Sequence, residues 1–334
     1  MHLQHNLSKK ILAWYDNNRR ELPWRVSKKS PKQLYYRLLS EFMLQQTQVK
    51  TVLPYFKNFL LHYPTLEALS KSNEKKVLKL WEGLGYYRRA RNLLATAKTL
   101  VKEHNSKLPK EIINIKKLPG VGDYTANALL AFIYDQPTIA IDGNVKRVFS
   151  RLLNRNETSI DFPKLIQNNK KSLFKIKRYS DFVEALMEFG AIICKPKVPE
   201  CSRCNIKNAC KHFKSDKKFK QKKKIQLLEK SYDIFCYIDK IKNKIALTKK
   251  HNLGFLNNFY LPSIKETKTK NTIKNWNFHS NFKNFISNKK LNINLYYKYS
   301  SKLPTQFKWF SLKDNNEFIP SFTKKVFKQF SKFN

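Results

Sequence analysis

Residues 118–126 read Leu-Pro-Gly-Val-Gly-Asp-Tyr-Thr-Ala, and the rest of the chain is organised around them. Two glycines one residue apart allow a hairpin tighter than side-chained residues permit, because glycine adopts positive φ at little cost. Beyond Gly122, apolar residues recur at helical spacing as far as Phe132. The first turn of such a helix carries unpaired N–H groups and the positive end of the helix dipole. The stretch therefore predicts a hairpin followed by a helix N-terminus that can bind phosphate.

An acid follows the next loop, at Asp142 in Ile-Asp-Gly-Asn-Val, residues 141–145. The chain can fold back there so that Asp142 lies near the helix N-terminus that is predicted to bind phosphate. A phosphate-binding turn beside a buried carboxylate indicates chemistry on nucleic acid. A Gly-x-Gly turn is weak evidence when it stands alone, so the remaining motifs decide its meaning.

The composition indicates an ordered, two-domain protein that binds a polyanion. The chain has 334 residues, of which 41% are hydrophobic and 13% aromatic, which excludes a disordered protein. Its net charge of +43 favours nucleic acid, although biased coding in a chain rich in Lys, Asn and Ile is an alternative explanation. No apolar run reaches the roughly 18–20 residues of a membrane span, so we expect no membrane partner. The first residues lack an apolar signal segment, so we expect a cytoplasmic, nucleoid-associated protein. We also expect a monomer.

The first two-thirds of the chain is predicted to be all-α. One helix is expected over residues 7–20, and a long helix is expected to begin near Gln33. Its predicted buried positions are Leu38, Phe42, Val49 and Val52. Glu41 lies inside this helix, where a solvated surface acid is the ordinary interpretation, but four uncharged polar residues follow at 45–48. Such a run suits hydrogen bonds to base edges.

Residues 83–91 read Gly-Leu-Gly-Tyr-Tyr-Arg-Arg-Ala-Arg and combine a flexible loop, two tyrosines and three arginines. Arginines at a helix start bind backbone phosphates, and Leu84 or Tyr86 at the loop tip could wedge between bases. An ordinary loop with core aromatics and solvated charges explains these residues equally well.

Four cysteines lie within seventeen residues, at Cys194, Cys201, Cys204 and Cys210. Four thiolates suit either tetrahedral zinc or an iron–sulfur cluster, while disulfides would need an oxidising compartment. Only one C-x2-C pair is present, and the longer arms favour the larger cluster. Cys236 lies outside this group and is expected to be a buried apolar residue.

The pattern changes near residue 230. Eight lysines surround one acid between Lys211 and Lys224, which indicates a linker or an arm that tracks DNA. Strands are predicted at 234–238, 245–247 and 292–297, with a closing helix over 321–330. We therefore expect a helical domain over 1–212, a basic linker over 213–230 and an α+β domain over 231–334, which resembles a binding domain.

Taken together, the motifs resemble the adenine DNA glycosylases of the helix-hairpin-helix superfamily. The matching motifs are residues 22–25, 41–49, 83–92, 118–126, 141–148 and the four-cysteine loop. The resemblance implies a mainly α, helix-hairpin-helix DNA glycosylase fold with an iron–sulfur cluster loop, plus a smaller α+β Nudix-like C-terminal domain. It also implies a 4Fe–4S cofactor and, as partner, double-stranded DNA with A:8-oxoguanine or A:G mispairs.

The same resemblance implies a role for each matching residue. Glu41 matches the general acid that protonates N7 of adenine, and Asp142 matches the carboxylate that stabilises the cationic sugar. This requires Glu41 to be the less solvated of the two. Tyr124 and Asn144 match residues that assist at the sugar and position Asp142. Residues implied to contact substrate or DNA are Arg20, Trp24, Arg25, Gln45, Gln46, Leu84, Tyr86, Gly120, Val121, Gly122, Glu184 and Ser287. Of these, Glu184, Arg20 and Trp24 match positions that line the adenine pocket.

The residue at position 124 separates this family from the endonuclease III-like enzymes. Those relatives carry a lysine there that forms a Schiff base and cuts the strand, and tyrosine cannot form an imine. We therefore expect adenine removal without efficient strand cleavage. The alternatives are an endonuclease III-like glycosylase/lyase and a non-catalytic DNA-binding protein.

Two departures from the family pattern affect these expectations. The segment between Trp24 and Glu41 is longer than in the family. In the C-terminal domain, residues 286–288 read Ile-Ser-Asn where the family has Phe-Ser-His. Two outcomes follow for discrimination of the oxidised guanine: it is weakened, or Ser287 supplies most of it.

Overall fold

The computed structural model describes residues 6–216, 227–251, 253, 256–267, 273–286, 289–313 and 317–330. The chain divides into two compact units, Met1–Ser72 with Arg88–Lys222, and Asn73–Tyr87 with Lys223–Asn334. We describe each unit by itself.

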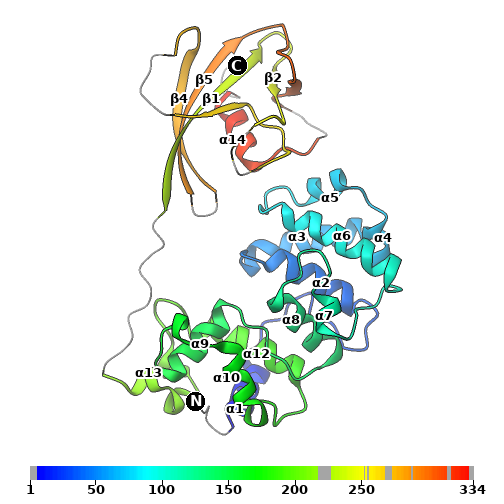
Figure 1. Ribbon diagram of the computed structural model, residues 1–334, viewed down its shortest axis with the longest axis vertical. Helices are drawn as coiled ribbons and strands as arrows, with labels where there is room; N and C mark the ends of the chain where they lie inside the picture. The colour runs from blue at the N-terminus through cyan, green and yellow to red at the C-terminus, as the bar shows by residue number, and fades with distance from the viewer. Residues whose placement is uncertain are drawn as a thin grey trace. The chain divides into compact units, whose positions relative to one another are not determined.

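All regular secondary structure in the described residues of the first unit is helical, as expected (Figure 1). Its α-helices are α1 (Leu7–Asn18), α2 (Gln33–Leu44), α3 (Val49–His62), α4 (Leu66–Ser70), α6 (Arg88–Glu103), α7 (Ile112–Ile115), α8 (Asp123–Tyr134), α9 (Gly143–Leu153), α10 (Phe162–Asn168), α11 (Lys170–Leu173), α12 (Tyr179–Ile192) and α13 (Lys211–Lys214). Short 3-10 helices lie at Glu157–Ser159, Cys201–Arg203 and Lys207–Ala209. Helix α12 is central, since it packs against α1, α8 and α9 and contributes Phe182, Leu186 and Phe189 to the core.

The single long helix predicted from Gln33 is wrong, because α2 ends at Leu44 and α3 begins at Val49. Between them Gln46 adopts a left-handed conformation with φ of 56°. The guanidinium of Arg89 on α6 donates to three carbonyl oxygens at the end of α2, those of Phe42, Met43 and Gln45, at 3.1, 2.7 and 2.6 Å. These bonds satisfy carbonyls that a continuing helix would have used, so a distant residue ends α2. Val49 is half-buried instead of buried.

The hairpin forms where the sequence predicts it, between α7 and α8. Gly120 has φ of +77°, and a Cβ there would lie 2.5 Å from the Asn92 side-chain nitrogen. Gly122 is the N-cap of α8 with φ of −94°, and a Cβ there would meet nothing within 4 Å. The turn itself therefore requires only the first glycine. The second leaves open space in front of the helix N-terminus.

The C-terminal part of the second unit is a sheet with strand order β4-β5-β1-β2-β6, and β3 also pairs with β1. The strands are β1 (Leu228–Asp239), β2 (Lys244–Leu247), β3 (Ser263–Glu266), β4 (Asn277–Ile286), β5 (Lys289–Tyr299) and β6 (Lys308–Ser311). Strands β1 and β5 are parallel. The strands predicted at 234–238 and 245–247 lie in β1 and β2, which pair antiparallel with Ile238 opposite Ile245. Helix α14 (Ser321–Phe330) covers one face of the sheet (Figure 1), and Val326 and Phe327 pack there with Ile234 and Ile293.

The same unit includes α5 (Glu74–Leu80) and the loop after it. The Tyr87 ring lies edge-on to Phe259 and Phe318, with centroid distances of 5.3 and 4.7 Å. Its hydroxyl accepts a hydrogen bond from the backbone N–H of Ser321 at 3.1 Å. Tyr87 therefore packs as a core aromatic of this unit.

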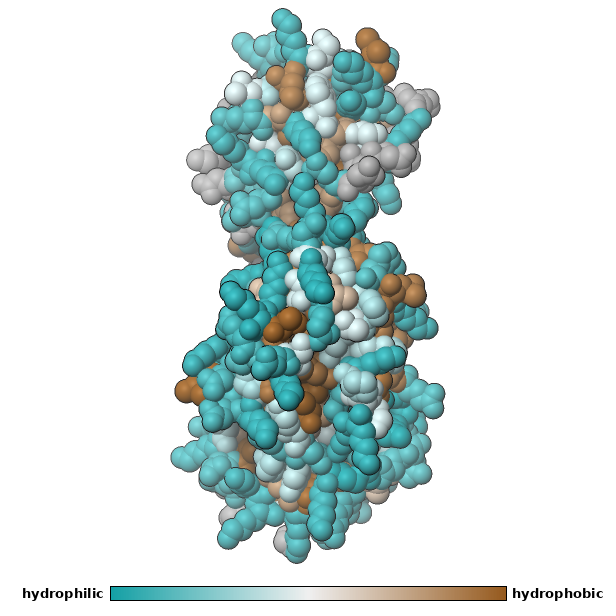
Figure 2. All heavy atoms as spheres, turned by 90° about the vertical axis from the view of Figure 1, so that its right-hand side faces the viewer, coloured by the Kyte–Doolittle hydropathy of each residue, from teal (hydrophilic) through white to brown (hydrophobic). Residues whose placement is uncertain are grey.

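The predicted fold class is confirmed as a mostly helical chain with a smaller C-terminal sheet domain. Residues 217–226 of the predicted linker and Ser287 lie outside the described residues, and the domain boundaries stay a prediction. Across the part of the chain that is described, no helix combines the length and the apolar character of a membrane span. Hydrophilic side chains predominate on the face shown in Figure 2, as expected of a chain with 67 Lys and Arg residues.

Candidate active site

Glu41 lies inside α2 and is 5% exposed. Burial raises the pKa of its carboxyl to about 7, against the lowering effects of the nearby Arg37 guanidinium and of a hydrogen bond with the Tyr124 hydroxyl. Its second oxygen, Oε2, is buried and has no hydrogen-bond partner among the described residues. A carboxylic acid that is partly protonated near neutral pH and has a free buried oxygen is suited to donate a proton to a ligand.

Asp142 is the N-cap of α9 and is half-buried. Its Oδ1 accepts from the Val145 backbone N–H and its Oδ2 from the Asn144 side-chain amide, both at 2.7 Å. Burial raises the pKa of Asp142, and these two hydrogen bonds act against the rise. Glu41 is thus the more buried acid, as the two-carboxylate chemistry requires.

Tyr124, in the first turn of α8, brings the two acids into one site. Burial raises the pKa of its phenol well above the usual value, and the charges of Glu41 and Asp142 raise it further. Asp142 in turn raises the pKa of Glu41. The structure therefore places three of the four predicted catalytic side chains within electrostatic reach of one another, and Asn144 holds the fourth position beside Asp142.

Helix α12 contributes two further buried acids, Glu184 and Glu188. Glu184 is buried and accepts from the Tyr15 hydroxyl and from Arg37 Nη1. It also forms an ion pair with Arg25 Nε at 2.9 Å. One turn later, Glu188 is 1% exposed and binds both Arg25 and Arg20. The predicted residues Arg20, Arg25 and Glu184 therefore belong to one ion-pair network, in which the two glutamates are buried and Arg20 is exposed.

Sequence reasoning missed Tyr15, Arg37 and Glu188 in this network. Two signals were available in the helical spacing: Arg37 precedes Glu41 by four residues, and Glu188 follows Glu184 by four. Each spacing places the two side chains on the same face of one helix.

The other predicted DNA-contact residues differ in exposure. Gln46 and Tyr86 are exposed, and both have positive φ, 56° and 49°. Leu84 is only 6% exposed, so it would have to leave its packing to enter a duplex. Trp24 packs as a core residue with its ring edge-on to Phe56. Tyr86 is therefore the better placed wedge of the two predicted in its loop.

The Asp142 site is tied to the start of the cysteine loop by Arg147. Its Nη2 donates to the Asn144 side-chain oxygen at 2.8 Å and to the Gly190 carbonyl at 2.7 Å. Its Nε donates to the Cys194 carbonyl at 2.7 Å. Close packing supports this contact, since a Cβ on Gly190 would lie 2.6 Å from Asn144 Cβ. Arg147 thus fixes the amide that orients Asp142.

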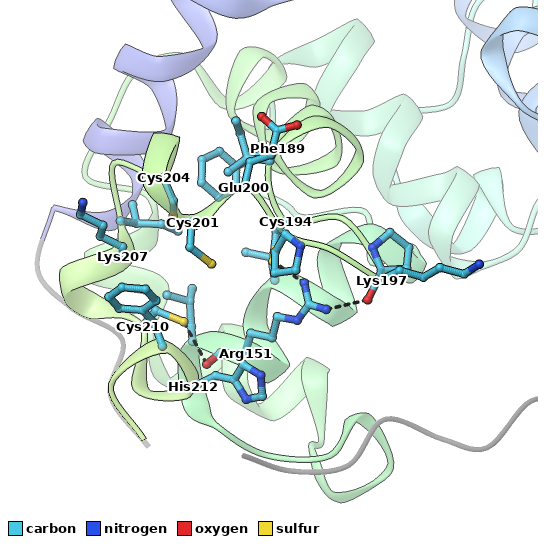
Figure 3. A pocket seen from close by; sticks show the side chains of 17 residues that line it. Arg151, Phe189, Cys194, Lys197, Glu200, Cys201, Cys204, Lys207, Cys210 and His212 are labelled. Carbon is cyan, nitrogen blue, oxygen red and sulfur yellow. Dashed lines mark hydrogen bonds between the residues drawn. The ribbon is translucent and has the colours of Figure 1, made fainter. Parts of the chain in front are cut away.

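The four predicted metal ligands surround one cavity of about 330 Å³ (Figure 3). Its walls include Cys194, Cys201, Cys204 and Cys210. Arg151 Nη1 donates to Cys194 Sγ at 3.3 Å, and the Cys210 thiol donates to the Arg151 carbonyl at 3.3 Å. Among the described residues, no three His, Cys, Asp or Glu side chains are grouped to hold a metal ion. The four thiols thus line this cavity together with thirteen other residues.

Comparisons with known proteins agree with this geometry. The HhH-GPD superfamily of base excision DNA repair proteins matches residues 39–174. The chain is 38% identical over 299 residues to the adenine DNA glycosylase of Buchnera aphidicola subsp. Baizongia pistaciae, covering 85% of this chain and 83% of that one. It is 37% identical over 208 residues to the adenine DNA glycosylase of Homo sapiens, covering 60% and 38% of the two chains.

Solved structures show the same fold. A thermostable thymine-DNA glycosylase is 26% identical with a TM-score of 0.55, and the match covers 62% of this chain and 94% of that one. A trapped endonuclease III–DNA covalent intermediate, 22% identical with a TM-score of 0.50, shows the fold alone over 62% of this chain and 93% of that one. The chain therefore belongs to the adenine DNA glycosylase family of HhH-GPD base excision repair proteins, hydrolases that act on N-glycosyl bonds.

Proposed function

We propose that this DNA glycosylase removes adenine mispaired with 8-oxoguanine or guanine and leaves the DNA strand intact. One observation supports the proposal: a buried acid with a raised pKa, Glu41, shares a site with the hydrogen-bonded carboxylate Asp142, and Tyr124 interacts electrostatically with both. Because adenine inside a duplex cannot reach a buried acid, the base must first be flipped out of the stack.

In the proposed reaction, Glu41 donates its proton to N7 of the flipped adenine. The C1′–N9 bond then breaks, and its electron pair leaves with the base. Asp142 stabilises the positive charge that develops on the sugar, as the second carboxylate does in glycoside cleavage. Water adds its oxygen to C1′ and returns a proton to Glu41, which restores the acid. Asn144 keeps Asp142 oriented through its 2.7 Å hydrogen bond.

The test is single-turnover excision on duplexes with adenine opposite 8-oxoguanine, opposite guanine or opposite thymine. We expect adenine to be released fastest from the duplex with 8-oxoguanine and not at all from the duplex with thymine. An oxidised pyrimidine in the same sequence tests the endonuclease III-like alternative. Release of the pyrimidine, or strand breaks before alkali treatment, would contradict the proposal, because Tyr124 offers no amine for a Schiff base.

We propose that the C-terminal sheet domain reads the base opposite adenine, and that the lysine-rich surface binds duplex phosphates. The rate ratio between the 8-oxoguanine and guanine duplexes, measured on the full chain, tests the first part. For the second part, affinity should fall steeply between 50 and 200 mM salt, since each phosphate contact releases counterions. A flat salt response would show that the +43 charge does not serve DNA binding.

We propose that Cys194, Cys201, Cys204 and Cys210 hold a 4Fe–4S cluster. The fit rests on the donor set, four thiols around one cavity, and on Arg151, which binds the sulfur of one of these cysteines and the thiol of another. When bound, the cluster supplies a cross-link that fixes the loop beside α9 and α12. The purified protein should show broad visible absorbance and contain iron, and colourless protein that contains zinc would overturn the assignment.

A further inference from the structure

Arg37 is a buried arginine of the first unit, and burying its charge costs free energy unless other groups compensate it. Its side chain is 8% exposed, and its guanidinium lies 4.6 Å from the centre of the Phe132 ring. It precedes Glu41 by one helical turn on α2, so the two side chains share a face. Nη1 donates to Glu184 Oε1, while Nε is buried without a hydrogen-bond partner among the described residues.

The groups that face Glu41 come from four elements. They are Arg37 on α2, Tyr124 on α8, Asp142 before α9 and Glu184 on α12. Two of these are acids, whose charge makes proton release from Glu41 harder. Arg37 brings the opposite charge to the same face, and it is also the hydrogen-bond partner of Glu184. One side chain thus touches the adenine pocket acid and opposes its effect on the proton donor.

We propose that Arg37 is a positioning residue for base removal: it fixes Glu184 in the adenine pocket and keeps Glu41 able to release its proton. The inference rests on the proposed function, and it assigns to α2 both the proton donor and the cation that sets its acidity. A cation within a few ångströms stabilises the carboxylate form of an acid, which is the product of proton transfer.

Loss of the Arg37 charge has two expected consequences. Glu41 holds its proton more tightly, so it becomes a weaker acid and transfers the proton less readily to adenine. Glu184 loses one of its buried partners, while its contacts with Tyr15 and Arg25 stay. The plateau rate should therefore fall while the pH range over which Glu41 stays protonated extends upward.

The experiment compares the wild type with Arg37→Met, Arg37→Lys and Arg178→Met, each as full-length protein. Single-turnover excision of adenine opposite 8-oxoguanine is measured from pH 5.5 to 9.5. In the resulting pH–rate profile, the alkaline limb is the range in which the rate falls as Glu41 loses its proton, and the plateau lies below it. Arg37→Met should lower the plateau rate roughly tenfold and move the alkaline limb up by about one pH unit. Arg37→Lys keeps the charge and should hold the limb within a few tenths of a unit. Arg178→Met removes an exposed arginine that pairs with Asp16 and Asp181, and its limb should not move.

A second measurement reads Glu41 without catalysis. The infrared carbonyl band of protonated Glu41 is assigned by its absence in Glu41→Gln, and its titration midpoint is followed in each variant. Arg37→Met should raise this midpoint by about one unit. If Arg37→Met does not fold, Arg37→Met/Glu184→Gln removes both charges and leaves no unpaired acid, so its midpoint should stay near that of the wild type while Glu184→Gln alone lowers it.

The outcomes separate the two proposals. A wild type that does not release adenine overturns the proposed function, and the infrared midpoints still decide the role of Arg37. An active Arg37→Met protein whose limb and midpoint coincide with those of the wild type overturns the inference. So does an Arg37→Lys protein that shifts as far as Arg37→Met.

Discussion

The two carboxylates proposed to be catalytic show how position in a helix decides which hydrogen bonds reach one functional group. Glu41 lies in the interior of α2, where the backbone N–H groups are used by the helix itself, so only other side chains can assist it. Asp142 caps α9, where free N–H groups remain, and it accepts two hydrogen bonds of 2.7 Å. Burial raises the pKa of both acids, but the cap, unlike the helix interior, supplies a backbone N–H that supports the carboxylate against this rise.

The largest effect should come from neutralising the capping acid. Asp142→Asn keeps a side-chain oxygen that can accept from the Val145 N–H, so α9 should still begin at the same residue. The negative charge at the sugar is lost, and we expect base release to fall at least about a thousandfold. Excision is measured under single turnover, and duplex affinity by a gel shift.

Duplex affinity is the control for this variant, and it should change by less than about threefold. Retained base release with unchanged affinity would show that Asp142 is not the stabilising carboxylate. Lost affinity together with lost release would show instead that the substitution damages the hairpin region.

Neutralising the interior acid should give the next largest effect, with a distinct pH signature. Burial raises the pKa of Glu41 to about 7, and the reaction needs its protonated form. The wild-type rate should therefore fall as the pH rises above about 7. Glu41→Gln cannot donate a proton, and its residual rate, lower by roughly a hundredfold to a thousandfold, should be independent of pH over this range. A wild-type rate that rises from pH 7 to 9 would contradict the assignment of the acid.

The contrast between the two acids also shows what could be predicted from the sequence. Glu41, Tyr124, Asp142 and the cysteines stand in short motifs that match those of the adenine DNA glycosylases, so the resemblance identified them by reading along the chain. Strands β1, β2 and β5 and helix α14 likewise follow local periodicity, whereas β3, β4 and β6 were not predicted. The predicted features depend on neighbours within a few residues.

The features that could not be predicted depend on distant partners. The break between α2 and α3 requires Arg89, 44 residues beyond the Gln45 carbonyl that it binds. Glu184 is held by Tyr15 and Arg37, which are 169 and 147 residues away in sequence. A local pattern identifies the charged residue but not its buried partner. Ser287 lies outside the described residues, so the role of Ser287 stays a prediction.

A third effect concerns stability and needs no substrate. The pKa of Glu41 is higher in the folded protein, about 7, than its ordinary value of 4.5. The folded state therefore binds the proton more tightly, and this stabilisation is complete below about pH 4.5 and is lost as the pH rises through 7. Since each pKa unit is worth about 1.4 kcal/mol, the wild type should lose about 3 kcal/mol of unfolding free energy relative to Glu41→Gln between pH 4.5 and 8.

Denaturant unfolding of both proteins across this range measures the difference. Asp16→Asn is the matched control, because Arg178 lowers the pKa of Asp16 and its contribution is lost only below the ordinary value of 3.8. Its stability difference from the wild type should be flat from pH 4.5 to 8. Parallel curves for the wild type and Glu41→Gln would show that Glu41 is not desolvated in solution.

The smallest effect on the excision rate should come from disturbing Asp142 without disturbing Glu41. Arg147 binds the Asn144 oxygen and the carbonyls of Gly190 and Cys194, so Arg147→Met loosens the amide that orients Asp142 while leaving Asp142 its own bond to the Val145 N–H. We expect a rate about tenfold lower, with the alkaline limb of Glu41 unmoved, because no described contact of Arg147 involves Glu41. Iron content and visible absorbance, measured on the same protein, show whether the cysteine loop survives. A lowered rate with intact cluster and an unmoved limb would establish that the two carboxylates can be perturbed independently, whereas a shifted limb would mean that the capping and interior acids titrate as one coupled pair.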